Sequence, residues 1–128
     1  MRDIPDEFHD LFEKRTFAHV TTIDPRGRPH TTPVWVDYDD GHVLVNTERE
    51  RRKTKNAERN PNVSVSMTDP DDPYRFCSIT GTVAEITEDG AREHIDELAH
   101  RYTGDDYDLP IQSPRVLIRV RPDEVRHS

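Results

Sequence analysis

The chain has 128 residues, so we expect a single domain over residues 1–128 and no second one. Apolar residues make up only 31% of the chain, so we expect a thin core that gains stability from a subunit interface, as in a homodimer, or from a bound ligand. The formal net charge of -8 excludes a surface that attracts nucleic acids or anionic membranes, unless positive charge is concentrated in one place.

The sequence contains no recognisable targeting or membrane signal. Its first residues, MRDIPDEFHD, have neither the basic nor the apolar segment of a signal peptide. No stretch approaches the roughly 20 apolar residues that a membrane-spanning helix needs. Cys77 is the single cysteine, so no disulfide can form within the chain. We therefore expect a cytoplasmic protein.

The first half of the chain predicts a short helix followed by three strands. In residues 5–14, PDEFHDLFEK, the two phenylalanines and the leucine fall on one helical face. Residues 17–24, 29–39 and 42–47 are rich in β-branched and aromatic side chains, and the turn sequences PRGR and DDG separate them. These three segments predict an antiparallel meander.

The second half predicts two helices and three further strands. The predicted helices are residues 48–60 and 88–103, and the predicted strands are residues 62–68, 74–86 and 115–122. Gly81 lies inside the longest of these strands, where we expect a bend or bulge. Because strands outnumber helices and tight turns join most of them, the pattern predicts a mainly β protein with flanking helices (α+β), in which six antiparallel strands form a small barrel.

One segment is strongly basic although the chain as a whole is acidic. Residues 47–60, TERERRKTKNAERN, hold six of the 18 Lys and Arg residues. Most such runs are solvated helix faces, and Thr47 with Glu50 fits a helix capping box. A structural role alone is therefore one interpretation of this segment.

Two features of the basic segment favour a ligand instead. Ala57 is its single apolar residue, so the predicted helix lacks the apolar stripe that normally fixes a helix to the core. Arg51 and Lys55 lie four residues apart, as do Arg49 and Lys53, so like charges would stack along the helix. A phosphate group at the junction of strand and helix would relieve both problems, because guanidinium groups and the free N–H groups of a first helical turn bind phosphate.

Three stretches of the sequence together resemble a known family. HVLVNTERERRKTKNAERNPNVSV, preceded by GRPHTTPVW and followed by ITGTVAEI, is similar to the pyridoxamine-phosphate-oxidase-like split β-barrel superfamily. Within it, the chain is most similar to the small deazaflavin-dependent reductases that bind coenzyme F(420). The resemblance covers residues 15–125 and implies a six-stranded antiparallel split β-barrel, as in flavin reductases, and a homodimer with the cofactor at the subunit interface.

The resemblance also implies which residues bind the cofactor. Those expected at its phosphate lie on a strand end and the basic helix that follows: Thr47, Arg51, Arg52 and Lys53, with Lys55 and Asn56 as further neighbours. Those expected along its ring lie on one strand and act chiefly through backbone groups: Thr32, Pro33, Val34 and Trp35.

The implied activity is hydride transfer between F(420) and an electron-poor small-molecule acceptor, for which no catalytic acid or base is required. FMN is the alternative cofactor, because the flavin-binding and deazaflavin-binding branches share the phosphate site. A non-catalytic cofactor-binding protein is the alternative role. Dedicated pyridoxamine phosphate oxidation is not expected, since the C-terminal residues RVLIRVRPDEVRHS lack a recognisable substrate-phosphate signature.

Other kinds of site have little support in the sequence. The basic segment has no interleaved aromatic residues that could stack on bases, which argues against nucleic acid binding. The seven histidines show no zinc-site spacing and there is one cysteine, so no metal site is expected. Cys77 is expected to pack within a strand as a small apolar residue.

Overall fold

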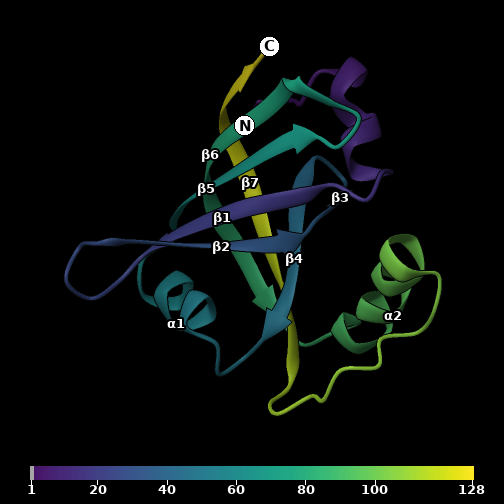
Figure 1. Cartoon of the computed structure of the whole chain (residues 1–128). Coiled ribbons are helices and arrows are strands. Elements are labelled where there is room, and N and C mark those ends of the chain that lie inside the picture. The colour runs from purple at the N-terminus through teal and green to yellow at the C-terminus, as the bar shows by residue number, and fades with distance from the viewer. Residues whose placement is uncertain (1) are drawn as a thin grey trace.

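Seven antiparallel strands form one curved sheet in the order β2-β1-β5-β6-β7-β4-β3 (Figure 1). A computed structural model describes residues 2–128. The strands are β1 (Phe17–Ile23), β2 (Pro29–Trp35), β3 (Asp37–Asp39), β4 (His42–Glu48), β5 (Asn62–Asp69), β6 (Asp72–Thr87) and β7 (Arg115–His127). The helices are the 3-10 helix η1 (Asp6–Phe12), α1 (Arg52–Arg59) and α2 (Ala91–Thr103). The predicted mainly β split barrel with flanking helices is confirmed.

The open side of the barrel lies between β2 and β4. β2 pairs with β1 alone among the strands, and the curvature of the sheet brings it beside β4, which pairs with β7 and β3. In Figure 1, α1 lies below β1 and β2, and α2 lies on the other side of β4. The ends of β2 and β4, the start of α1 and one face of α2 therefore surround the same side of the molecule.

The predicted count of six strands is wrong, because residues 29–39 form two strands and not one. β2 pairs with β1 whereas β3 pairs with β4, so the chain changes partner at Val36 and the predicted meander becomes two hairpins. Helix α2 holds this corner: the Val36 N–H donates to the Tyr102 hydroxyl (3.1 Å), and the Val36 carbonyl accepts from Arg101 (2.7 Å). The strand-like residue pattern continues through the corner and therefore does not reveal it.

Two groups of apolar side chains form the core. The larger group fills the interior of the barrel, and η1 covers one end of it. This group includes the fully buried Cys77, as expected, and burial raises the pKa of its thiol to about 11. The smaller group consists of Ile95, Leu98 and Tyr102 on α2. It faces the open side of the barrel.

The longest strand, β6, is irregular at Gly81, as predicted. Its register with β7 shifts between Thr80 and Gly81. A Cβ atom at Gly81 would lie 2.4 Å from the backbone oxygen of Arg121, so only glycine allows the two strands to come this close.

Helix α1 is shorter than the predicted helix over residues 48–60, and the predicted capping box is wrong. Thr47 lies in β4, and Arg51 is the N-cap residue without a side-chain capping bond. Polar contacts hold the helix instead of an apolar stripe. Thr54 donates to the Glu48 carbonyl (2.7 Å), and the Asn56 amide donates to the Thr22 hydroxyl (3.1 Å). These hydrogen bonds hold α1 in place although the helix has no apolar stripe.

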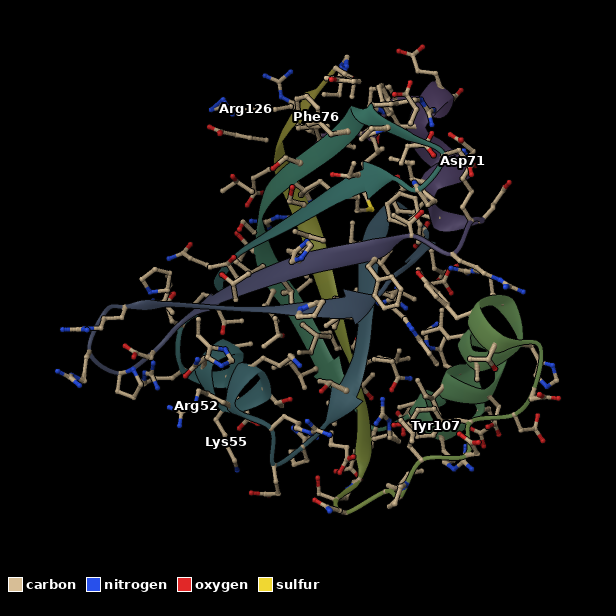
Figure 2. The ribbon with its side chains drawn as sticks, in the orientation of Figure 1. Arg52, Lys55, Asp71, Phe76, Tyr107 and Arg126 are labelled. Carbon is tan, nitrogen blue, oxygen red and sulfur yellow. The ribbon has the colours of Figure 1, made fainter. Side chains whose placement is uncertain are left out.

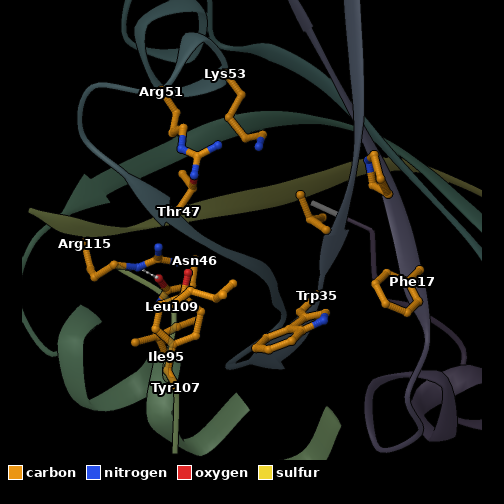
Figure 3. A pocket seen from close by; sticks show the side chains of 12 residues that line it. Phe17, Trp35, Asn46, Thr47, Arg51, Lys53, Ile95, Tyr107, Leu109 and Arg115 are labelled. Atoms are coloured by element: carbon orange, nitrogen blue, oxygen red, sulfur yellow. Dashed lines mark hydrogen bonds between the residues drawn. The ribbon is translucent and has the colours of Figure 1, made fainter. Parts of the chain in front are cut away.

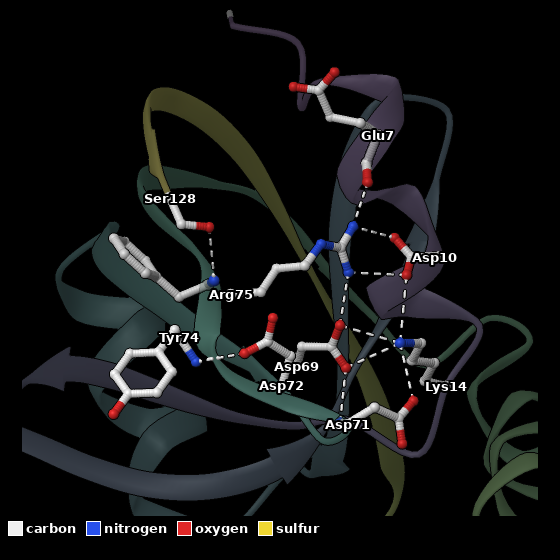
Figure 4. A network of polar contacts seen from close by, with 10 residues as sticks. Glu7, Asp10, Lys14, Asp69, Asp71, Asp72, Tyr74, Arg75 and Ser128 are labelled. Carbon is white, nitrogen blue, oxygen red and sulfur yellow. Dashed lines mark hydrogen bonds and ion pairs between the residues drawn. The ribbon is translucent and has the colours of Figure 1, made fainter.

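A network of ion pairs fixes η1 to the turn between β5 and β6 (Figure 4). The buried carboxylate of Asp69 lies 2.9 Å from the Lys14 ammonium and 2.8 Å from the Arg75 guanidinium. Arg75 also pairs with Asp10 of η1 (2.7 Å), and Lys14 pairs with Asp71 (3.0 Å). The Asp71 N–H and the Lys14 ammonium lower the pKa of Asp69 to about 2. Each charge in this Asp69 network therefore has an opposite charge in direct contact.

Candidate functional site

A cavity of about 280 Å³ lies on the open side of the barrel (Figure 3). Its walls include residues of β2 and β4, of the junction between β4 and α1, of helix α2, and of the start of β7. Its polar wall consists of Asn46, Thr47, Arg51, Lys53 and Arg115. Its less polar wall consists of Phe17, Pro33, Val34, Trp35, Ile95, Tyr107 and Leu109. The cavity thus joins a cationic region to an aromatic and aliphatic one.

Three cations form part of the polar wall, and acidic side chains neutralise only part of their charge. The Lys53 ammonium has neither a hydrogen-bond nor an ion-pair partner within residues 2–128, and burial, together with Arg51 and Arg115, lowers its pKa. The buried carboxylate of Glu48 is the nearest acid, at 3.9 Å from Arg51 and 3.6 Å from Arg115. Three cations and one carboxylate leave two positive charges at this wall. Such a wall favours an anionic ligand.

The Thr47 hydroxyl and the start of α1 add hydrogen-bonding groups to the cationic wall. Thr47 is 5% exposed, and its hydroxyl has no hydrogen-bond partner in the described chain. α1 begins at Arg52, and the first N–H groups of a helix have no acceptor within the helix. These groups, together with Lys53 and Arg51, are the kinds of donor that bind phosphate oxygens.

The apolar wall is built around Trp35. Its indole ring stacks on Tyr102 with ring centroids 4.9 Å apart, and Tyr107 meets it edge-on at 6.2 Å. The Tyr102 hydroxyl donates to the Thr16 carbonyl and accepts from the backbone N–H at the end of β2. Trp35 is therefore held by a rigid support. An aromatic wall of this kind suits a flat ring system.

The structure brings together six of the ten residues that the sequence predicts at the site. Those that line the cavity are Pro33, Val34, Trp35, Thr47, Arg51 and Lys53. The other four do not line it. Thr32 lies on the same strand, and its hydroxyl is buried without a partner in residues 2–128. Asn56 is 2% exposed and bonds to Thr22, whereas Arg52 and Lys55 are exposed on α1 (Figure 2).

Several cavity residues are not predicted from the sequence. Asn46 directly precedes the predicted phosphate residues, and Arg115 lies far from them in the chain. Arg115 reaches the site because β4 pairs with β7, which places Glu48 opposite Arg115. Tyr107 and Leu109 come from the long loop after α2. The strand pairing between β4 and β7 is the signal that would have identified Arg115.

Among residues 2–128, no group of three or more His, Cys, Asp and Glu side chains could hold a metal ion. In the same part of the chain, no helix has the length and apolar character needed to cross a membrane.

Comparison with known proteins assigns the chain to a family. The family model described as pyridoxamine 5'-phosphate oxidase matches residues 4–128. The chain belongs to this family. Among solved structures, the chain is similar to an F(420) reductase, with 30% identity over 96% of this chain and 98% of that one and a TM-score of 0.84. It is also similar to a conserved hypothetical protein from Mycobacterium tuberculosis, with 26% identity over 99% and 89% of the two chains and a TM-score of 0.75.

More distant members of the pyridoxamine 5'-phosphate oxidase fold differ in role. HutZ, the heme storage protein of Vibrio cholerae, is 16% identical over 98% of this chain and 95% of its own, with a TM-score of 0.69, which shows a shared fold alone. No significant match is found among curated protein sequences. The family match and the F(420) reductase neighbour together support a flavin-binding or deazaflavin-binding family of oxidoreductase type.

Proposed function

We propose that this protein is an oxidoreductase that binds coenzyme F(420) in the cavity and transfers a hydride between it and an electron-poor small-molecule acceptor. The observation that carries the proposal is the cavity itself, in which partly uncompensated cations at the start of α1 face an aromatic wall around Trp35. A flat ring joined to a phosphate matches both walls. The similarity to an F(420) reductase supports the deazaflavin as the ring.

The residues at the cavity fit such a cofactor. Lys53 and the Thr47 hydroxyl lack partners among residues 2–128, and a phosphate group would provide acceptors for both. Pro33 and Trp35 would border the ring. When bound, the deazaflavin supplies the hydride chemistry, and the protein contributes binding, orientation and exclusion of water. No side chain of this chain is assigned as an acid or base.

We further propose a homodimer whose second copy completes the site. Phe17 and Leu109 line the cavity yet are 56% and 61% exposed, which leaves apolar surface at its rim. A second chain packed against this rim would bury that surface and exclude water from the ring. The low apolar content of the chain also favours an additional interface.

FMN is the alternative cofactor, and the charge of the cavity is the observation that favours it. The two excess positive charges match the dianionic terminal phosphate of FMN. The phosphate of F(420) is bonded on both sides and carries one charge, so it needs a carboxylate of its oligoglutamate tail to match the same excess. A cofactor-binding protein without turnover remains the second alternative to an enzyme.

Absorption spectroscopy of the purified protein tests the proposal. The protein is incubated with F(420) or with FMN, freed of excess cofactor, and then supplied with a quinone acceptor after reduction. We expect saturable binding of F(420) and acceptor-dependent oxidation of the reduced form. Binding of FMN and not of F(420) would identify FMN as the cofactor. Binding of a cofactor whose reduced form no acceptor of a panel oxidises would indicate a carrier. Failure to bind either cofactor would overturn the proposal.

A further inference from the structure

Arg115 is a buried cation at the wall of the cavity. It is 8% exposed, and its guanidinium lies 5.1 Å from the ring centre of Tyr107. Its Nε–H donates to the Asn46 side-chain oxygen (2.9 Å), as Figure 3 shows, while the nearest carboxylate, that of Glu48, is 3.6 Å from Nη1. Burial lowers the pKa of Arg115. Its charge is therefore only partly compensated, by one buried carboxylate at ion-pair distance.

The amide of Asn46 has one orientation that satisfies its neighbours. Its nitrogen donates to the Ala91 carbonyl (2.8 Å) and contacts Nδ1 of His94 (3.1 Å), both on α2. Its oxygen accepts from Arg115 on the opposite side. Rotation of the amide by half a turn would place its nitrogen against the Arg115 N–H and its oxygen against the Ala91 carbonyl. The acceptor for Arg115 thus depends on the partners of Asn46 on α2.

His94 must accept from Asn46, and this fixes the position of its proton. If Nδ1 is the acceptor, the ring proton is on Nε2, which lies 2.9 Å from the Asp37 carboxylate. Burial alone would raise the pKa of Asp37, but bonds from His94 and Arg101 lower it below its ordinary value. Asp37 is therefore an ionised acceptor, and hydrogen bonds run in one direction from Arg115 through Asn46 and His94 to Asp37.

We propose that Arg115 completes the anion site of the cavity with Arg51 and Lys53, and that Asn46 and His94 are positioning residues that hold its guanidinium there. The inference rests on the proposed function and adds to it a specific role for a residue outside the basic segment. The bond to Asn46 fixes one N–H of the guanidinium. Nη1 also lies 3.6 Å from the Glu48 carboxylate. The N–H groups that neither Asn46 nor Glu48 occupies are available to an anionic oxygen of the ligand, such as phosphate.

Protonation of His94 would disturb this arrangement. A proton on Nδ1 would face the Asn46 amide nitrogen, so two donors would meet and the amide would turn away. Arg115 would then lose its acceptor. Five other charged groups lie near His94. Four of them line a second surface hollow together with His94, namely Asp39, Glu93, Glu97 and Arg119. The fifth, Arg101, pairs with Asp37. We therefore expect ligand affinity to fall when His94 becomes doubly protonated.

Nitrogen-15 NMR of the ligand-free protein tests the chain of hydrogen bonds without any cofactor. At pH 8 we expect His94 to carry its proton on Nε2. The Arg115 Nε–H signal should shift on addition of inorganic phosphate, and also on addition of F(420) or FMN. A proton on Nδ1 of His94, or an Arg115 signal that none of the three probes moves, would overturn the inference. If phosphate moves the signal but neither cofactor binds, the proposed function fails while the anion site stands.

Affinity measurements between pH 8 and pH 5 test the positioning role. Arg115→Gln should raise the dissociation constant of F(420) or FMN by about 10-fold or more. His94→Gln keeps an acceptor for Asn46 but cannot be protonated, so it should bind like the parent at pH 8 and keep that affinity at any pH where a second proton on His94 weakens binding by the parent. Because the FMN phosphate itself titrates near pH 6, the effect is read as the difference between parent and variant.

The matched control is His100→Gln, which changes an exposed histidine of the same helix that pairs with Asp106. This variant should follow the parent at every pH. Parent-like affinity of Arg115→Gln would overturn the ligand-binding role of Arg115. A loss of affinity in His94→Gln at pH 8 as large as that in Arg115→Gln would overturn the role of His94 as the acceptor that holds Asn46.

Discussion

Two clusters of charged side chains differ in how their charges are compensated. In the Asp69 network, Lys14 and Arg75 each lie within 3 Å of a carboxylate, and the buried acid lies between them. At the cavity, Lys53 has no carboxylate partner within residues 2–128, and Arg51 lies 3.9 Å from its nearest one. Both clusters contain basic residues of similar kinds. The Asp69 network joins two elements of the fold, whereas the cavity retains positive charge that favours an anionic ligand.

The contrast shows why basic residues alone do not locate a binding site. A cation that meets an acid in the folded chain contributes to stability and has little charge left for a ligand. A half-buried cation without an acid destabilises the free protein and gains from an anion. The distinction depends on the fold, since Asp69 and Lys14 are distant in sequence.

The largest expected effect is a loss of stability on breaking the Asp69 network. Asp69→Asn removes the buried carboxylate that Lys14 and Arg75 share, so two charge-assisted contacts are lost. Lys14 keeps Asp71 and Arg75 keeps Asp10 as ion-pair partners. We expect the melting temperature to fall by about 10 °C. Calorimetry of parent and variant measures this. An unchanged melting temperature would show that the Asp69 network does not stabilise the fold, which would contradict the contrast with the cavity.

The stability that ionised Asp69 contributes should also depend on pH. The folded-state pKa of Asp69, about 2, lies below that of an aspartate in the unfolded chain, about 3.9. Its contribution to stability is therefore complete above about pH 5 and is lost as the pH falls toward 2. Urea unfolding at a series of pH values should show this loss in the parent, and a smaller loss in Asp69→Asn. Equal slopes for the two proteins would contradict it.

Removal of the Lys53 charge should leave the stability of the ligand-free protein unchanged or raise it, in contrast to the loss expected for Asp69→Asn. The pKa of Lys53 is lowered, chiefly by burial, so its charged form is disfavoured by folding at neutral pH. Lys53→Met should therefore melt at the same temperature as the parent or a few degrees higher. The difference should vanish above about pH 11, where the lysine is neutral in the unfolded chain as well. A clear fall in melting temperature at neutral pH would contradict the account of an uncompensated cation.

The smallest effects are expected at the exposed face of α1. Arg52 does not line the cavity, and Lys55 forms an exposed ion pair with Glu50 at 3.2 Å. Exposed pairs contribute about 0 to 1 kcal/mol. Arg52→Met and Lys55→Met should each change the melting temperature by no more than about 2 °C and cofactor affinity by less than about twofold. Weaker binding of tenfold or more would place these residues at the ligand after all.

The sequence predicts the residues that β4 and α1 contribute to the candidate site, because these residues are close together in the chain. Thr47 lies near the end of a recognisable strand, Arg51 and Lys53 follow it, and the resemblance to a family implies a role for them in cofactor binding. Arg115 could not be predicted, because only the pairing of β4 with β7 brings it beside Asn46. The strand order and the corner at Val36 also depend on contacts with α2 that residue periodicity does not encode.

The most direct test of the cationic cavity is a titration of three proteins with F(420) and with FMN, followed by absorbance: the parent, Lys53→Met and Arg52→Met. The two variants each remove one charge from α1, but Lys53 lines the cavity and Arg52 does not. We predict that Lys53→Met raises the dissociation constant of the bound cofactor by about 10-fold to 150-fold, the equivalent of one or more charge-assisted hydrogen bonds. Arg52→Met should match the parent. Parent-like affinity of Lys53→Met, or equal losses in both variants, would contradict the assignment of this cavity as the cofactor site.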